Sequence, residues 1–144
     1  MNMRDSLNKY YYDTIVCDLR HLSRTGGGEI SCNSMMYLDV ISYQQEDGGC
    51  TVSRIAKTLN ISNSAVTIKV NELVKLGLVQ KSRSSQDKRV VQLSLTPETA
   101  EFLKAYDSPF ERALQEVEKK FNAQEINTFC LILETFLEEY KKEF

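Results

Sequence analysis

Side chains that can hydrogen bond to nucleic acid gather in the middle of the chain. Segment 50–92 holds eight Lys or Arg residues against only Glu72 and Asp87, a net charge of +6. The flanking segments 1–49 and 93–144 carry −3 and −5, so the whole chain carries −2. A basic centre between acidic arms predicts that only the centre contacts phosphate groups.

Two short helices joined by a tight turn are predicted to present these groups. Thr51 is the expected N-cap of the first, in which apolar residues recur at helical spacing, namely Val52, Ile55, Ala56 and Leu59. Asn60 tolerates the turn, and Ser62 is the expected N-cap of the second helix. That helix should end at Gly77, because glycine readily adopts the left-handed conformation that follows a helix.

The second helix has one apolar face, with Val66, Val70 and Leu73, and an outer face of mostly small polar side chains. Such side chains, on a helix that fits the major groove, can hydrogen bond to base edges. The alternative is an ordinary solvated face. The candidate DNA-binding residues of the two helices are Arg54, Ser62, Asn63, Ser64, Thr67, Ile68, Asn71 and Lys75.

A β-hairpin is predicted directly after the second helix. Its strands are Leu78–Arg83 and Arg89–Leu95, and a polar tip, 84–88, joins them. A hairpin of this shape can lie along the DNA backbone and insert arginine into the minor groove. The candidate DNA-binding residues here are Arg83, Ser84, Ser85, Asp87, Lys88 and Arg89.

The run NISNSAVTIKVNELVKLGLVQKSRSSQDKRVVQLSLT resembles the core of the MarR family of bacterial regulators. The specific elements are D-x-R at Asp87 to Arg89, then L-x-L-T at Leu93 to Thr96. The resemblance implies that Arg89 reaches the minor groove while Asp87 orients it through a bidentate pair, although the pair could also merely stiffen the hairpin tip. Two departures are Ile68, where relatives often carry a basic residue, and Glu72 nearby. Either Ile68 contacts thymine methyl groups, or the helix adds little affinity.

The predicted fold is mainly α (α+β), a winged helix-turn-helix with N- and C-terminal dimerisation helices. Its parts are an N-terminal helix and connection (1–30), a DNA-binding lobe (31–96) and C-terminal helices (97–144). Thr96 should cap the first C-terminal helix, and Pro109 should kink or split it. The last helix begins with an Asn122–Glu125 cap and is apolar on more than one side.

A second copy of the chain is the expected partner of that last helix, with the N-terminal helix as its complement, rather than packing within one chain. The apolar side of the N-terminal helix carries Tyr12, Ile15, Val16, Leu19 and Leu22. A homodimer would hold two reading helices about 34 Å apart, which predicts a palindromic DNA site.

A small-molecule effector is expected from the resemblance. The candidate pocket residues are His21, Cys32, Met36, Tyr37 and Tyr43, which could equally be plain packing residues. They would suit an aromatic or acyl ligand; the segments MMYLDVI and RSSQDKRVVQLSLT also look similar to the branch that regulates fatty-acid synthesis genes, which implies an acyl effector. Thiol-based redox sensing through Cys17 or Cys32 is an alternative. A single histidine argues against a zinc sensor, so no metal or cofactor is expected.

An enzyme is not expected. The Gly26–Gly28 run lacks the lysine and the spacing of a phosphate-binding loop, and a nucleophile motif is missing. No apolar run reaches the ~18 residues of a membrane span, so a cytoplasmic protein is expected. The sequence thus predicts a DNA-binding transcriptional regulator, a repressor by resemblance. The remaining alternative is a winged-helix module that binds only protein.

Overall fold

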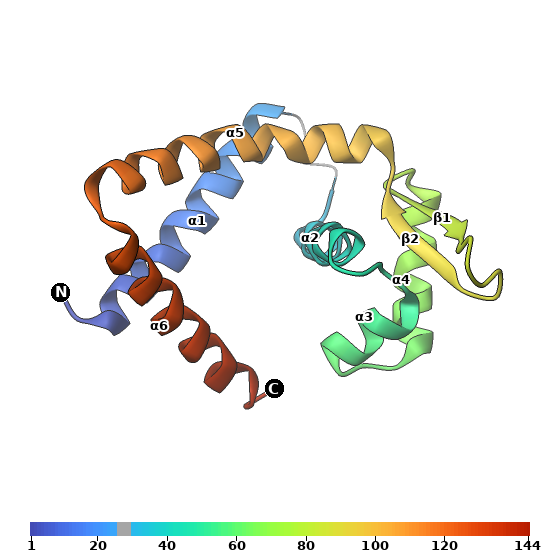
Figure 1. Ribbon diagram of the computed structural model, residues 1–144. Helices are drawn as coiled ribbons and strands as arrows, with labels where there is room; N and C mark the ends of the chain where they lie inside the picture. Colours follow the sequence, from blue (N-terminus) through green and yellow to red (C-terminus); the bar gives the residue numbers. More distant parts are fainter. Residues whose placement is uncertain (26–29) are drawn as a thin grey trace. The chain divides into compact units, whose positions relative to one another are not determined.

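The computed structural model describes residues 1–25 and 30–144, which form six helices and one two-stranded sheet (Figure 1). Two compact units, 1–39 and 40–144, divide the chain, and the second begins within helix α2. The predicted Gly26–Gly28 connection lies outside the described residues.

The elements follow the predicted order. In the N-terminal part, α1 spans Met3–Thr25 and α2 spans Cys32–Glu46. The predicted helix pair is α3, Val52–Leu59, and α4, Asn63–Lys75. The remaining elements are β1 (Val79–Arg83), β2 (Val91–Leu95), α5 (Pro97–Lys120) and α6 (Ala123–Lys141).

The core of the second unit lies where α2, α3, α4 and the hairpin meet. Its buried apolar residues are Ile41, Cys50, Ile55, Ala56, Val66, Val70, Leu73, Val79, Leu93 and Leu95. Most of them come from helix faces with 3–4 spacing or from alternate strand positions, which is why two short helices and a hairpin can share one core.

The ends of α3 and α4 form as their local sequence predicts. The Thr51 hydroxyl accepts a hydrogen bond from the backbone N–H of Arg54, and Ser62 does the same for Ala65. Asn60 takes the left-handed conformation between the helices, with φ 54°. After α4, Gly77 has φ 74°, which lets the N–H of Leu78 donate to the Leu73 carbonyl at 3.0 Å.

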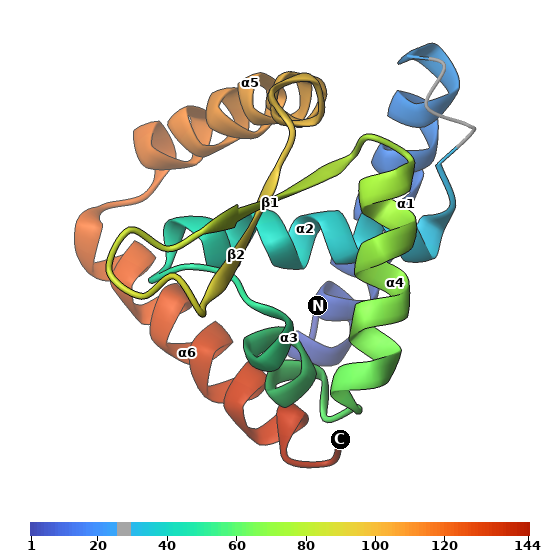
Figure 2. The same ribbon diagram turned by 90° about the vertical axis from the view of Figure 1, so that its right-hand side faces the viewer.

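The antiparallel hairpin pairs Val79 with Leu95 and Arg83 with Val91. Figure 2 shows the strands side by side, with their connecting loop at the end remote from α4. Two hydrogen bonds dock β2 on the preceding segment: Leu93 N donates to the Cys50 carbonyl (2.8 Å), and Leu95 N to Gln45 Oε1 (2.9 Å). These bonds fix the hairpin to the body that carries α4.

The second strand begins two residues later than predicted. The Asp87 carbonyl accepts from Val90 N at 3.0 Å, and the Asp87 carboxylate accepts from Arg89 N, also at 3.0 Å. Arg89 therefore lies in a turn rather than in the strand ladder, because its N–H is already used within the loop.

The C-terminal helices begin at the predicted caps, Thr96 and Asn122; Glu125 completes a capping box with Asn122. Pro109 does not split α5, so that part of the prediction is wrong. Proline removes only one helical hydrogen bond, to the carbonyl of Ala105, and this residue is exposed so that water can replace the lost donor.

Candidate nucleic-acid interface

Helix α4 presents an outer face made largely of small polar side chains. Val66, Val70 and Leu73 are completely buried beneath it, which confirms the predicted orientation. Exposed on this face are the predicted DNA-binding residues, namely Ser62, Asn63, Ser64, Thr67, Ile68, Asn71 and Lys75. The hydroxyls and amides of this set can donate to and accept from base edges, and the unpaired N–H groups of the helix start favour phosphate.

Two contacts restrict the polar groups of α4. Lys81 Nζ, from β1, donates to Asn71 Oδ1 at 2.7 Å. Lys69 Nζ lies 3.4 Å from Glu72 Oε1, so the acid beside the reading face is neutralised within its own helix. The role of Lys81 was not predicted, because a lysine ten residues from its partner gives no local signal.

The loop between the strands, 84–90, is held by its own backbone and short side chains. Arg83 Nη1 donates to the Lys88 carbonyl at 2.7 Å, and Ser84 Oγ accepts from Gln86 N at 3.2 Å. Arg83 and Ser84, both predicted to bind DNA, thus also brace the loop. Ser85 and Lys88 are exposed.

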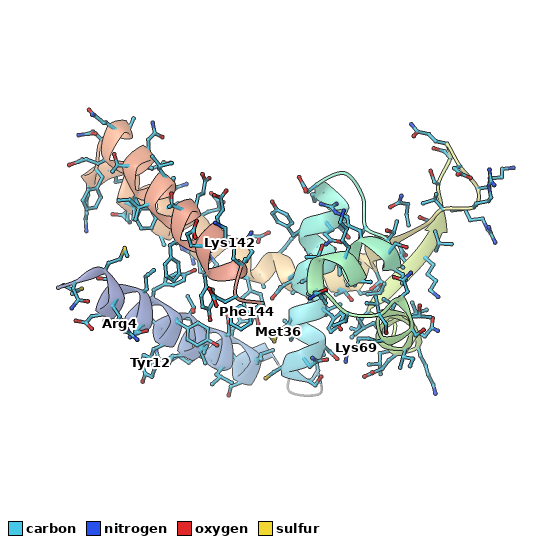
Figure 3. The ribbon with its side chains drawn as sticks, turned by 90° about the horizontal axis from the view of Figure 1, so that it is seen from below. Arg4, Tyr12, Met36, Lys69, Lys142 and Phe144 are labelled. Atoms are coloured by element: carbon cyan, nitrogen blue, oxygen red, sulfur yellow. The ribbon has the colours of Figure 1, made fainter. Side chains whose placement is uncertain are left out.

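The Arg89 side chain extends from this loop and is 93% exposed. Its Nε lies 3.5 Å from Asp87 Oδ1, the same oxygen that accepts the Arg89 backbone N–H. The expected bidentate pair is therefore wrong: one carboxylate oxygen serves both the turn and the side chain. The Nη groups have no hydrogen-bond partner among the described residues, and Figure 3 shows nitrogen-tipped side chains projecting from the loop.

Arg54 binds the loop between α2 and α3. Its Nη1 donates to the carbonyls of Asp47 and Gly49, the latter at 2.7 Å, and its Nη2 contacts Asp47 Oδ2 at 2.7 Å. A third carbonyl, that of Gln44, lies 3.3 Å from Nη1. The side chain is only 35% exposed. This candidate DNA-binding residue thus has a role within the fold that the sequence did not reveal.

Arg54→Ala is expected to lower the free energy of unfolding by about 1–3 kcal/mol, because several carbonyl oxygens lose their charged donor. Arg54→Lys should not restore stability, since an ammonium group cannot reproduce the planar fork. Denaturant unfolding followed by circular dichroism measures the effect. Lys57→Ala removes the same charge from an exposed site of α3 and should change stability by less than about 0.5 kcal/mol. Equal stability of the Arg54 and Lys57 variants would contradict the structural role.

The candidate effector residues fall on two helices. Cys32, Met36 and Tyr43 are exposed on α2, whereas His21 of α1 and Tyr37 of α2 are half-buried. In the same N-terminal part, desolvation and the charge of Asp18 raise the pKa of Asp39. The effector pocket stays a prediction.

The cysteines differ in their chemistry. Cys50 is fully buried, and burial raises the pKa of its thiol to about 11, against the opposing charge of Arg54. Cys50 therefore stays protonated at neutral pH and is a poor redox sensor. Cys17, Cys32 and Cys130 are exposed. Thiol sensing through Cys17 or Cys32 stays a prediction.

Neither a metal centre nor a membrane span emerges from the part of the chain that the structure describes. Within residues 1–25 and 30–144, no three His, Cys, Asp or Glu side chains converge as metal ligands would. Within the same ranges, every helix is too short or too polar to cross a bilayer.

Comparison of the sequence with protein families gives a match over residues 34–91 to the MarR family. Transcriptional regulator ZitR of Lactococcus lactis subsp. cremoris is 34% identical over 94 residues, 63% of this chain and 65% of that protein. Bacillus subtilis YwhA, an uncharacterized HTH-type transcriptional regulator, is 33% identical over 53% of this chain and 60% of its own length. Bacillus subtilis MdtR, an HTH-type transcriptional repressor, is 34% identical over 42% of this chain and 39% of its own length.

The chain thus spans less than two thirds of the length of each of these relatives. Their names are those of regulators, which agrees with the expectation that the chain is not an enzyme.

Solved structures resemble the chain over nearly its whole length. Streptococcus pneumoniae FabT in complex with DNA has a TM-score of 0.72 at 22% identity, and the match covers 99% of this chain and 97% of FabT. A mutant of MepR from a multidrug-resistant clinical isolate of S. aureus has a TM-score of 0.62 at 19% identity, over 92% and 96% of the two chains. At such identities the likeness concerns the fold, and it confirms the predicted winged helix-turn-helix.

Proposed function

We propose that the chain, which matches the MarR family over residues 34–91, binds double-stranded DNA as a homodimer and regulates transcription. One observation carries the proposal: the polar outer face of α4 and the exposed Arg89 lie within the +6 segment, on elements that share one core. In this arrangement α4 enters the major groove, and the hairpin, hereafter the wing, follows the backbone toward the minor groove.

The basic segment makes this DNA binding strongly dependent on salt. Each neutralised phosphate releases counterions and contributes about −0.9 to the slope of log K against log salt concentration. A dimer carries two +6 segments. With six or more phosphate contacts, affinity should fall roughly 10³-fold or more between about 50 and 200 mM salt.

Capture of genomic fragments by the purified protein, followed by sequencing and by titration of the retained duplexes, tests the proposal. A recurring palindrome, bound with the steep salt dependence, is the expected result. If no duplex is retained at low salt while the protein is folded, the chain is not a DNA-binding regulator, and the protein-only module becomes the better explanation.

The apolar surface of the terminal helices supports the proposed dimer. No residue of α6, all of which the structure describes, is buried within the chain. Its exposed large apolar side chains are Phe129, Leu131, Ile132, Leu137 and Tyr140. In α1, Tyr12 and Leu19 are also more than half exposed. Surface of this kind is typical of a subunit interface, and a two-fold dimer gives a palindromic site with half-sites about 34 Å apart.

Repression is the expected outcome of binding, since a dimer on an operator excludes other proteins from that DNA and the relative MdtR is named a repressor. An aromatic or acyl effector would relieve it by favouring another separation of the two reading helices, which is a coupling free energy between two sites. A thermal-shift screen with aromatic acids and acyl compounds would detect such a ligand, because a ligand that binds only the native state raises its stability.

A further inference from the structure

Ile68 is an exposed apolar residue in the centre of the outer face of α4. Its exposed fraction is 71%, although the opposite face of the same helix is completely buried. Figure 3 views the molecule from below, with Lys69 labelled on α4 and side chains of this helix projecting outward. A large aliphatic side chain in this position contributes nothing to the core and is free to contact whatever approaches the helix from outside.

The neighbours of Ile68 along the helix leave it accessible. Ser64 and Ala65, one turn before it, are short and exposed, and Asn71 and Glu72 follow one turn later. Glu72 is paired with Lys69. Ile68 therefore rises above small side chains on one side, and a flat base edge can approach it.

The hydrogen bond between Lys81 and Asn71 restricts how the Asn71 amide can recognise a base through polar contacts. Lys81 Nζ, 2.7 Å away, can only donate, so the atom of Asn71 that faces it must be the oxygen. An asparagine reads adenine with both its oxygen and its nitrogen. Lys81 thus occupies one of the two acceptor sites of the Asn71 oxygen and fixes the orientation of the amide, so a bidentate contact to adenine would have to share or displace this bond.

We propose that α4 selects thymine, with Ile68 packing against the C5 methyl group of one thymine in each half-site. The inference rests on the proposed DNA binding and specifies how the same surface discriminates between sequences. The methyl group is the one apolar feature that distinguishes base pairs in the major groove. An aliphatic side chain among donors and hydroxyls matches it, whereas a lysine or arginine there would favour guanine.

Replacement of single thymines by deoxyuridine in the retained palindrome tests this contact, because the change deletes only the methyl group and leaves base pairing intact. Each half-site should contain one thymine whose replacement lowers the affinity of the native protein by about fourfold, the effect of exposing one methyl-sized group. Replacement of this thymine in both half-sites together should lower the affinity by about 15-fold. Cytosine at that position should be rejected, and 5-methylcytosine, which carries the same methyl group, should be bound better than cytosine.

Ile68→Ala should bind the thymine duplex more weakly and lose its sensitivity to deoxyuridine. Leu76→Ala is the matched control, since Leu76 is an exposed aliphatic residue (60%) at the end of the same helix and should keep the full deoxyuridine effect. Both side chains are exposed, so both variants should unfold at nearly the native denaturant concentration.

The outcomes separate the two proposals. Salt-dependent DNA binding that is unchanged within twofold by deoxyuridine at every thymine would overturn the thymine contact and leave DNA binding standing. A deoxyuridine effect of equal size in the native protein and Ile68→Ala would assign the methyl contact to another residue and overturn the role of Ile68. Absence of binding to any duplex would overturn both.

Discussion

Arg89→Ala is expected to weaken operator binding by roughly tenfold or more, the effect of removing one arginine contact to DNA from each subunit. The Arg89 side chain is 93% exposed, its Nη groups have no partner within the described part of the chain, and the loop that carries it is braced by other residues. Its loss should therefore leave the fold intact. Fluorescence anisotropy with the labelled palindrome, at one fixed salt concentration, measures the effect.

Two further substitutions separate the guanidinium from its charge and its position. Arg89→Lys keeps the charge and should recover only part of the affinity, because a narrow minor groove favours the less strongly hydrated guanidinium. Gln86→Ala changes an exposed neutral residue of the same loop and should bind like the native protein. Native affinity in Arg89→Ala would remove the wing from the mechanism.

Leu137→Glu should have a still larger effect, because it attacks the proposed dimer rather than a DNA contact. A carboxylate in the centre of an apolar interface is costly to desolvate, and the variant should become monomeric. Each half-site would then be bound independently, which should lower affinity for the palindrome by about 10²- to 10⁴-fold. Sedimentation measures the mass of the protein, and anisotropy measures the affinity.

Asn127→Glu is the matched control for that experiment, since it adds the same charge at an exposed polar position of α6. It should remain dimeric and bind DNA nearly as the native protein does. A Leu137→Glu variant that stays dimeric with unchanged affinity would show that α6 meets its partner elsewhere or not at all.

Much of the fold could be predicted because its signals are local. The caps Thr51, Ser62, Thr96 and Asn122 each bond to a backbone N–H three residues ahead, so the residue type and its position suffice. The buried face of α4 follows from helical spacing in the same way. Two local predictions went wrong: Arg89 lies in a turn because Asp87 accepts its N–H, and α5 is not split at Pro109, where proline removes only one helical hydrogen bond.

The sequence predicted which residues belong to the candidate interface, but not which of them are available to bind DNA. Charge and spacing placed Arg54, Arg83 and Arg89 in one set of candidates. In the structure Arg54 binds backbone carbonyls five to ten residues away, Arg83 braces the loop, and Arg89 extends outward. These three arginines are therefore not equally available to DNA. Their availability depends on hydrogen-bond partners in the folded chain that the sequence pattern does not reveal.

The basic centre of this chain, the helix pair and the wing are determined by the sequence itself, because charge adds up along the chain and caps act within one helical turn. The tertiary structure decided which of those charges remain available to DNA. Lys81 meets Asn71 across ten residues, and Gln45 meets Leu95 across fifty. Such contacts form only after the chain has closed loops of that length, so the free energy that selects them belongs to the folded arrangement and not to any local segment.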